Sequence, residues 1–346
     1  MRKLTLFILL VFLFIIPVSA MEFTAPEAPN GAQTLMPEDT ESFGEGLWYV
    51  IKSAIGALQP DVAEAFRICL SLIAAVILVS ILQNFFGATK HIVELAGTVI
   101  VSLLLINTSN SLVTLGTQTV EELCEYGKLL LPVMTAAMAA QGRTTASAAL
   151  YTGTAFFSSL LSTVISRLIV PMIYIYLCLC IAHRAIGEEI LNRLRRLVKW
   201  GMTWTLKIIL YVFTGYISIT GVVSGTADAA AVKAAKLAIS GFVPVVGGII
   251  SDASETILVS AGVMKSAAGV YGLLAIIAIW IGPFLRIGIQ YLLIKATAAI
   301  CSVFGTKQTA GIVEDFSGTM GFALAMTGAV CLLLLISVVC FMKGVS

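Results

Sequence analysis

Long apolar runs separated by short polar stretches dominate the chain and predict a series of membrane-spanning helices. The runs cover residues 68–86, 92–115, 146–165, 168–182, 202–223, 267–285, 287–304 and 320–341, with a shorter one at 129–141. A helix needs about 20 apolar residues to cross a bilayer. We therefore expect an all-α, polytopic membrane protein with about seven to nine transmembrane helices. Nine follows if every run crosses, and seven if two neighbouring segments between 129 and 182 form a re-entrant pair.

A polar island at 226–266 interrupts this pattern and contains a 14-residue apolar insert, 237–250. The insert is too short to cross as one helix, and Pro244, Gly247 and Gly248 break it. Irregular backbone at membrane depth needs protein or water around its polar groups. Two arrangements fit: a re-entrant hairpin whose broken tip lines a pore, or an amphipathic hairpin that lies flat on the outer surface.

The N-terminus has the pattern of a secretory signal peptide. Arg2 and Lys3 precede an apolar stretch, and small residues lead to a cleavage position after Ala20. We expect residues 1–20 to be the signal peptide, with an uncleaved first helix as the alternative. Residues 21–66 are rich in acids and prolines and are expected to form an exterior segment.

The distribution of charge gives an orientation. Hydrophobic residues make up 59% of the chain and charged residues 12%, so each charged loop is informative. Basic residues cluster in loop 183–200, which the positive-inside rule assigns to the cytoplasm. The acids at 121–125, 252–255 and 314–315 are then expected outside, although Arg167 and Lys307 fall on that side too. This places the N-terminus outside and the C-terminus in the cytoplasm, with a transmembrane bundle at 67–225 and another at 267–346.

Four ionisable residues, Glu94, Lys207, Arg286 and Lys295, fall within or beside apolar runs. A charge at the bilayer centre costs about 2.5–3.5 kcal/mol even on the milder scales. Glu94 and Lys207 can reach the interface from helix ends. Arg286 follows a Gly282-Pro283 break and is expected at an interface or a pore. Lys295 lies near the middle of its run and is expected to face a cavity, a partner helix or a carboxylate.

Asp252 and Glu255 lie about one turn apart, within the polar island. On one helix face they suit a cation or the basic patch of a partner, or they are simply solvated. With Pro244, Gly247, Gly248, Arg286 and Lys295 they form our set of candidate pore or partner-contact residues.

Nothing in the sequence predicts an enzyme or a cofactor. The phosphate-binding G-x-x-x-x-G-K-[ST] and zinc-binding H-E-x-x-H motifs are both missing. The two histidines, His91 and His183, lie at helix ends, and the seven cysteines include no C-x-x-C pair. We expect no catalytic residue, no metal, no cofactor and no nucleic-acid partner.

The chain resembles the stage III sporulation protein AE family of endospore-forming bacteria. The resemblance rests on the signal peptide, the acidic exterior segment, the stretch 242–252 that reads FVPVVGGIISD, and the segment 271–305 with its IGPFLR sequence. It implies a multi-pass subunit of a channel or secretion-like complex in the membranes between mother cell and forespore. It also implies that the other subunits of this complex include a separate ATPase and ring-forming proteins. It also implies a place in the mother-cell membrane around the forespore and a requirement for forespore development and late gene expression.

Two other functions fit the same residues. An independent permease for a small solute or ion would use the polar groups inside the bundle. A purely structural scaffold would recruit partners through residues 21–66 and 226–265 and would tolerate changes at Lys295 or in the Pro244–Gly248 break.

Overall fold

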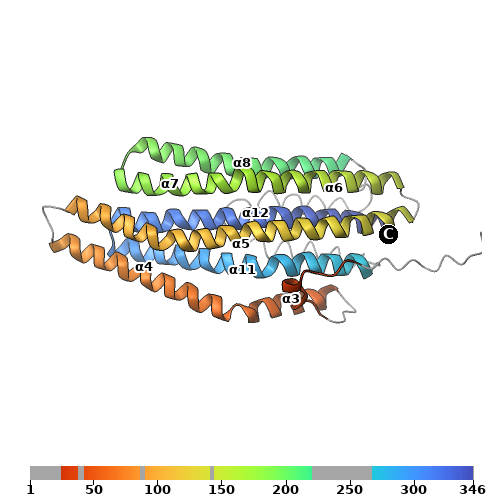
Figure 1. Ribbon diagram of the computed structural model, residues 1–346, viewed down its shortest axis with the longest axis horizontal. Coiled ribbons are helices and arrows are strands. Elements are labelled where there is room, and N and C mark those ends of the chain that lie inside the picture. The colour runs from red at the N-terminus through yellow and green to blue at the C-terminus, as the bar shows by residue number, and fades with distance from the viewer. Residues whose placement is uncertain (1–24, 38–42, 86–89, 141–143, 220–266, 346) are drawn as a thin grey trace, which may run out of the picture.

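The computed structural model describes residues 25–37, 43–85, 90–140, 144–219 and 267–345, and nearly all of these residues are helical. The helices run side by side in an elongated bundle (Figure 1). They are α2 (Asn30–Gln33), α3 (Phe43–Ala57), α4 (Gln59–Phe85), α5 (Lys90–Ala140), α6 (Thr144–Val164), α7 (Val170–Ile186), α8 (Glu189–Ile219), α11 (Ala267–Phe304) and α12 (Lys307–Val345), with a π turn, η2 (Ile165–Ile169), between α6 and α7. The expected all-α fold is confirmed.

The helices are longer than the apolar runs that predicted them. Helix α5 has 51 residues and joins the expected segments 92–115 and 129–141. At 1.5 Å per residue it is about 76 Å long. Residues 116–128 lower the hydropathy, but their glutamates and leucine favour a helix. The prediction that a helix ends where the apolar run ends, at residue 115, was therefore wrong. Pro132 also lies inside the same helix.

Two further pairs of expected spans are single helical rods. Residues 146–165 and 168–182 continue into each other through η2, and 267–285 and 287–304 form α11 with Pro283 inside it. Five helical segments of the described residues are long and apolar enough to cross a membrane: Gln59–Phe85, Ile92–Ala139, Thr144–Ile186, Gly269–Phe304 and Lys307–Lys343. The expected span 202–223 falls largely in α8, which is not among them. The prediction of nine separate crossings is therefore wrong for this part of the chain.

Helix α12 forms the centre of the bundle. It packs against α5 and α11 and also contacts α6 and α7, and most of its large side chains are buried. Phe316 and Phe341 have no exposed surface. Helices α6, α7 and α8 form one side of the bundle and α3, α4 and α11 the other (Figure 1). This strongly apolar helix is thus shielded largely by its own neighbours.

The helix ends correct the predicted orientation. Because α11 is one helix, the turn between α11 and α12 returns to the same end of the bundle as the basic turn between α7 and α8 (Figure 1). Glu314 and Asp315 therefore lie beside the basic loop 183–200, and their assignment to the opposite side was wrong. The last residues of α12 lie at the other end of the bundle. The sequence predicted that the C-terminus and the basic loop 183–200 both face the cytoplasm. The structure places them at opposite ends of the bundle, which does not support that prediction.

The contact between α6 and α8 depends on a glycine. The hydroxyl of Tyr216 donates a hydrogen bond of 2.8 Å to the carbonyl oxygen of Ala149, which holds the ring over Gly153. A Cβ atom at Gly153 would overlap that ring. At Gly215, also on α8, a Cβ atom would meet nothing within 4 Å.

We predict opposite effects for the same substitution at these two glycines. Gly153→Ala should lower the thermal unfolding midpoint, because the Tyr216 ring must shift and lose its hydrogen bond. Gly215→Ala should stabilise the protein by about 0.5–1 kcal/mol, because alanine favours a helix over glycine. Thermal unfolding of both variants in the same detergent tests this, and equal stabilisation by both would refute the close packing.

Candidate functional site

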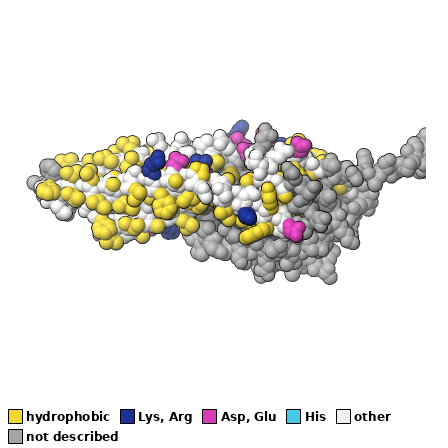
Figure 2. Space-filling view, turned by 90° about the horizontal axis from the view of Figure 1, so that it is seen from below, with side chains coloured by type: hydrophobic (Ala, Val, Ile, Leu, Met, Phe, Trp, Pro, Cys, Tyr) yellow, Lys and Arg dark blue, Asp and Glu magenta, His cyan; other side chains and the backbone are white. Residues whose placement is uncertain are grey.

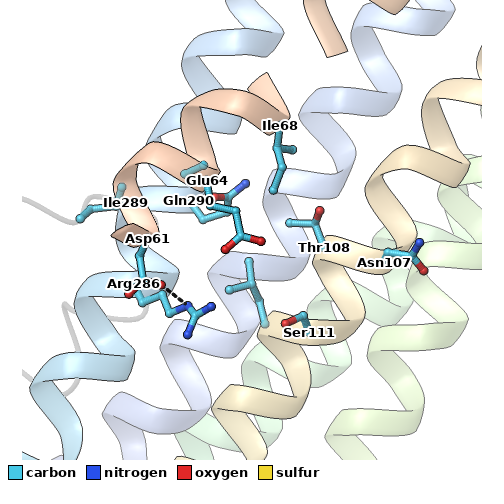
Figure 3. Close-up of a pocket in the computed structure, with 11 residues that line it drawn as sticks. Asp61, Glu64, Ile68, Asn107, Thr108, Ser111, Arg286, Ile289 and Gln290 are labelled. Carbon is cyan, nitrogen blue, oxygen red and sulfur yellow. Dashed lines mark ion pairs between the residues drawn. The ribbon is translucent and has the colours of Figure 1, made fainter. Parts of the chain in front are cut away.

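A polar pocket lies between α4, α5 and α11 (Figure 3). Its volume is about 200 Å³, enough for several water molecules or a small polar group. The lining includes two carboxylates, a guanidinium group, two amides and two hydroxyls. These residues are Asp61, Glu64, Arg286, Asn107, Gln290, Thr108 and Ser111. The apolar part of the lining comes from Ala65, Ile68, Leu112 and Ile289.

An ion pair joins α4 to α11 at this pocket. The Nε atom of Arg286 lies 3.2 Å from Oδ1 of Asp61 (Figure 3). Asp61 is in the first turn of α4, directly after Pro60, a position that favours both proline and an acid. The Arg286 side chain is 43% exposed and that of Asp61 27%, so the pair itself contributes little stability. Its larger effect is to fix which groups face the pocket.

One buried amide leaves the pocket incompletely satisfied. Gln290 is 5% exposed, and its Nε2 atom has no hydrogen-bond partner among the described residues. Glu64 is exposed and points its carboxylate toward the space between the three helices (Figure 3). A buried amide without a partner is costly unless water or a ligand completes it. The pocket is therefore suited to hold water or a small polar group.

Lys295 lies on another side of α11. It is nine residues from Arg286, which corresponds to about half a turn around the helix axis. The side chain is exposed, its Nζ atom is 3.3 Å from the Tyr291 hydroxyl, and it lies 5.5 Å from the centre of that ring. None of the ion pairs of the described residues includes it. The structure thus does not bring Arg286 and Lys295 together in one site.

The other candidate residues, Pro244, Gly247, Gly248, Asp252 and Glu255, lie outside the described residues. The choice between a re-entrant hairpin and a surface hairpin at 237–250 stays a prediction. Among the described residues no group of three or more histidine, cysteine, aspartate and glutamate side chains is arranged to hold a metal ion.

A second charged cluster joins α7, α8 and α12. Asp315 accepts a hydrogen bond from Nε of Arg184 at 2.7 Å and another from a terminal nitrogen of Arg195. The three side chains are between 10% and 18% exposed. Burial lowers the pKa of Arg195 and the charge of Asp315 raises it, with a net rise, so the guanidinium stays charged. This cluster ties the basic turn to the central helix.

Small residues on α12 make room for this cluster. A Cβ atom at Gly311 would overlap the Arg184 guanidinium, and one at Gly318 would lie 2.9 Å from the Tyr176 hydroxyl. The Tyr176 ring also meets Phe322 edge to face, with 5.8 Å between ring centres. Helix α7 therefore packs along α12 through glycines and an aromatic pair as well as through charge.

Sequence reasoning missed Asp61, Glu64, Gln290 and Asp315. The Pro60-Asp61 pair is a helix-start signal that marks Asp61 as the beginning of α4. No local signal marks Asp315, because its partners are 131 and 120 residues away in the chain. Gln290 is an isolated amide in an apolar run. Because burying an unpaired amide is unfavourable, this position could have been recognised from the sequence as a candidate polar site.

The bundle and its polar sites define a multi-pass helical membrane protein. Comparison of the sequence with family models shows that the chain belongs to the stage III sporulation protein AE family, whose model matches residues 38–344. The chain is also 22% identical over 318 residues to stage III sporulation protein AE of Bacillus subtilis strain 168, covering 90% of this chain and 79% of that protein. No solved structure matches it significantly. The family resemblance seen in the sequence is confirmed.

We predict that Asp315→Asn destabilises the protein markedly. The change leaves two largely buried guanidinium groups without a carboxylate, and hydrogen bonds to charged groups contribute about 1.5–3 kcal/mol each. Glu189→Gln is the matched control, because Glu189 pairs with Arg196 at 3.3 Å and both side chains are about 60% exposed. Thermal unfolding in detergent should show a clear loss for the first variant and almost none for the second. Similar midpoints would contradict a structural role for the cluster.

For the Asp61–Arg286 pair we predict rescue by exchange of charges. Arg286→Asp alone should weaken the contact between α4 and α11, because it places a third carboxylate beside Asp61 and Glu64. The double variant Asp61→Arg with Arg286→Asp should recover most of the loss. Thermal midpoints of the two single variants and the double variant measure the coupling, and additive losses would mean that the pair does not hold the helices together.

Proposed function

We propose that this protein is an integral membrane subunit of a channel or secretion-like complex between mother cell and forespore. Its role there is to support forespore development and late forespore gene expression. The observation that carries the proposal is the family match over residues 38–344, which covers nearly all of the chain after the expected signal peptide. The relative's description as a sporulation protein supports the biological context.

The structure supports a role inside a larger assembly. Helix α5 is about 76 Å long, far more than the roughly 30 Å of a hydrocarbon core. Surface of this extent beyond a bilayer suits contact with other proteins. The proposed partners are the other subunits of the complex, including a separate ATPase and ring-forming proteins, and the proposed location is the mother-cell membrane around the forespore. That the chain is not itself an enzyme remains a prediction.

Lys295 is the residue we propose for a contact with another subunit. It is an exposed cation between Leu292 and Ile300, which are exposed apolar residues on the same helix. A carboxylate on a neighbouring helix would neutralise it and stabilise the contact. Arg286, with its partner Asp61, is instead proposed to shape the polar pocket.

The pocket favours one alternative, an independent permease for a small solute or ion. Its carboxylates, amides and hydroxyls, together with the unpartnered Gln290, resemble the few polar groups that orient a small ligand. Purified protein that moves a solute alone across liposome membranes, and loses this activity in Arg286→Gln, would favour the permease.

The first test is deletion of the gene in the organism that encodes it. We expect arrest of sporulation after engulfment, a silent late forespore reporter and normal vegetative growth. Microscopy and the reporter measure this directly. Normal spores would overturn the proposed function and leave the permease as the better explanation.

We predict that Lys295→Leu impairs complementation of that deletion more than Lys207→Leu. Lys207 is the control because it is half-buried and lies on α8, whereas Lys295 lies on α11. Spore counts for the two variants at matched protein levels provide the measurement. Equal, mild effects would contradict a specific contact at Lys295.

A further inference from the structure

Helix α5 is too long for any ordinary position in a bilayer. Transmembrane helices tilt by up to about 40°, and at that tilt a 30 Å core is crossed by roughly 26 residues. Helix α5 has 51 residues without a break. About half of it therefore lies outside the hydrocarbon core, and its exposed side chains indicate which half.

The exposed side chains of α5 change character at Asn107. Before this residue, large hydrophobic side chains face outward at Ile92, Leu95, Val99, Ile100, Leu103, Leu104 and Ile106. From Asn107 to Ala140 the exposed large hydrophobic residue is Leu129. The exposed side chains there are mostly polar, among them Asn107, Asn110, Ser111, Gln118, Glu121, Glu122, Glu125 and Lys128. One helix thus presents an apolar surface followed by a hydrophilic one.

Helices α4 and α11 carry exposed large hydrophobic residues toward the same end, whereas those of α8 run from Ile190 to Val212 along most of the helix. Helices α4 and α11 end, and α5 begins, at the left of Figure 1. The exposed large hydrophobic residues of α11 are Leu292, Ile300, Val303 and Phe304, all toward that end. On α4 they include Leu70, Leu78, Ile81 and Phe85. We call residues 68–85, 90–106 and 292–304 the apolar half. Figure 2 shows hydrophobic side chains over this end, with charged side chains farther to the right.

The other half of the bundle has a hydrophilic outer face on α6. Thr144, Thr145, Thr152, Ser159 and Thr163 are exposed, whereas Leu150 and Leu161 of the same helix are buried against the bundle. Tyr151 and Phe156 are its exposed aromatic residues. We call residues 107–140 together with α6 the polar half. Thr152 and Thr163 donate to the carbonyl oxygens of Ala148 and Ser159, and their hydroxyl oxygens can still accept hydrogen bonds from water.

The height of the apolar half matches a bilayer. Residues 68–85 of α4 and 90–106 of α5 are about 25–27 Å long, close to the hydrocarbon core of roughly 30 Å. The polar pocket with Asp61, Glu64 and Arg286 lies at its inner margin, where headgroups begin. The exposed basic residues Arg193, Arg196 and Lys199 of α8 have long side chains that can extend toward headgroups.

We propose that lipid acyl chains surround only the apolar half, and that the polar half stands outside the hydrocarbon core in the aqueous phase. The occupant of the apolar surface is thus lipid, because its height fits a bilayer and polar residues bound it.

Two leucines on α5 form a matched pair for the test. Leu103 and Leu129 are each 60% exposed, and they lie in the apolar and polar halves respectively. The four native tryptophans, Trp48, Trp200, Trp204 and Trp280, are first replaced by phenylalanine. Leu103→Trp and Leu129→Trp are then made separately in the full chain and reconstituted into phosphatidylcholine vesicles, with or without brominated acyl chains.

Bromine quenches only tryptophans that contact the acyl chains. We expect Leu103→Trp to lose most of its emission in brominated vesicles and Leu129→Trp to lose almost none. Aqueous iodide, present on both sides of the membrane, should quench Leu129→Trp and spare Leu103→Trp. Equal quenching of both by bromine would overturn the proposal. So would a Leu103→Trp that neither bromine nor iodide reaches, since another chain would then cover the apolar half.

A second pair keeps the proposal testable if either variant fails to fold. Ile300→Trp on α11 and Phe156→Trp on α6 replace residues that are 44% and 60% exposed, in the apolar and polar halves respectively. Folding is checked by circular dichroism and the thermal midpoint of each variant against the tryptophan-free parent. The same pattern of bromine and iodide quenching is expected, and the reverse pattern would refute it.

Discussion

The structure depends on backbone hydrogen bonding that is unbroken along helices far longer than a bilayer is thick. Inside a helix every interior N–H and C=O group is paired, in lipid and in water alike. A long helix can therefore leave the membrane without any change in its backbone, and only its side chains must change. The exposed side chains of helix α5 change from apolar to polar between Ile106 and Asn107. The same backbone pairing allows the glutamates at 121–125 to lie inside one continuous helix, whereas Pro132 in that helix has no N–H to donate.

Helix packing in the two environments needs different forces. Lipid is as apolar as leucine, so burial of apolar surface does not drive helices together there, and close contact and polar pairs become important. The glycines of α12 that receive Arg184 and Tyr176, and the carboxylate of Asp315 between two arginines, provide such contacts. Wherever α12 lies outside a bilayer, its burial by α5 and α11 is favourable in itself. One central helix thus combines both kinds of stabilisation.

Much of the architecture was predictable from the sequence, whereas the number of crossings was not. Composition and apolar runs indicate an all-α membrane protein, and Arg286 and Lys295 are recognisable as unusual charges. Hydropathy, however, reports how apolar a segment is and not where a helix ends. The polar stretch 116–128 therefore suggested a helix end where helix α5 continues. Pairs such as Asp315 with Arg184 depend on tertiary packing between distant segments, and no local pattern encodes them.

The π turn at Ile165–Ile169 sets the rotation of α7 relative to α6. A π turn contains an additional residue, and one residue corresponds to a rotation of about 100° in an α-helix. Through this offset a single rod directs Gly153 toward α8 and Arg184 toward α12. A related chain lacking the additional residue would keep the length and composition of both helices, yet its arginine would point about a quarter of a turn away from the aspartate. The π turn therefore sets the direction in which the side chains of α7 point. Deletion of one residue there would disrupt the contact between Arg184 and Asp315 at the end of α7.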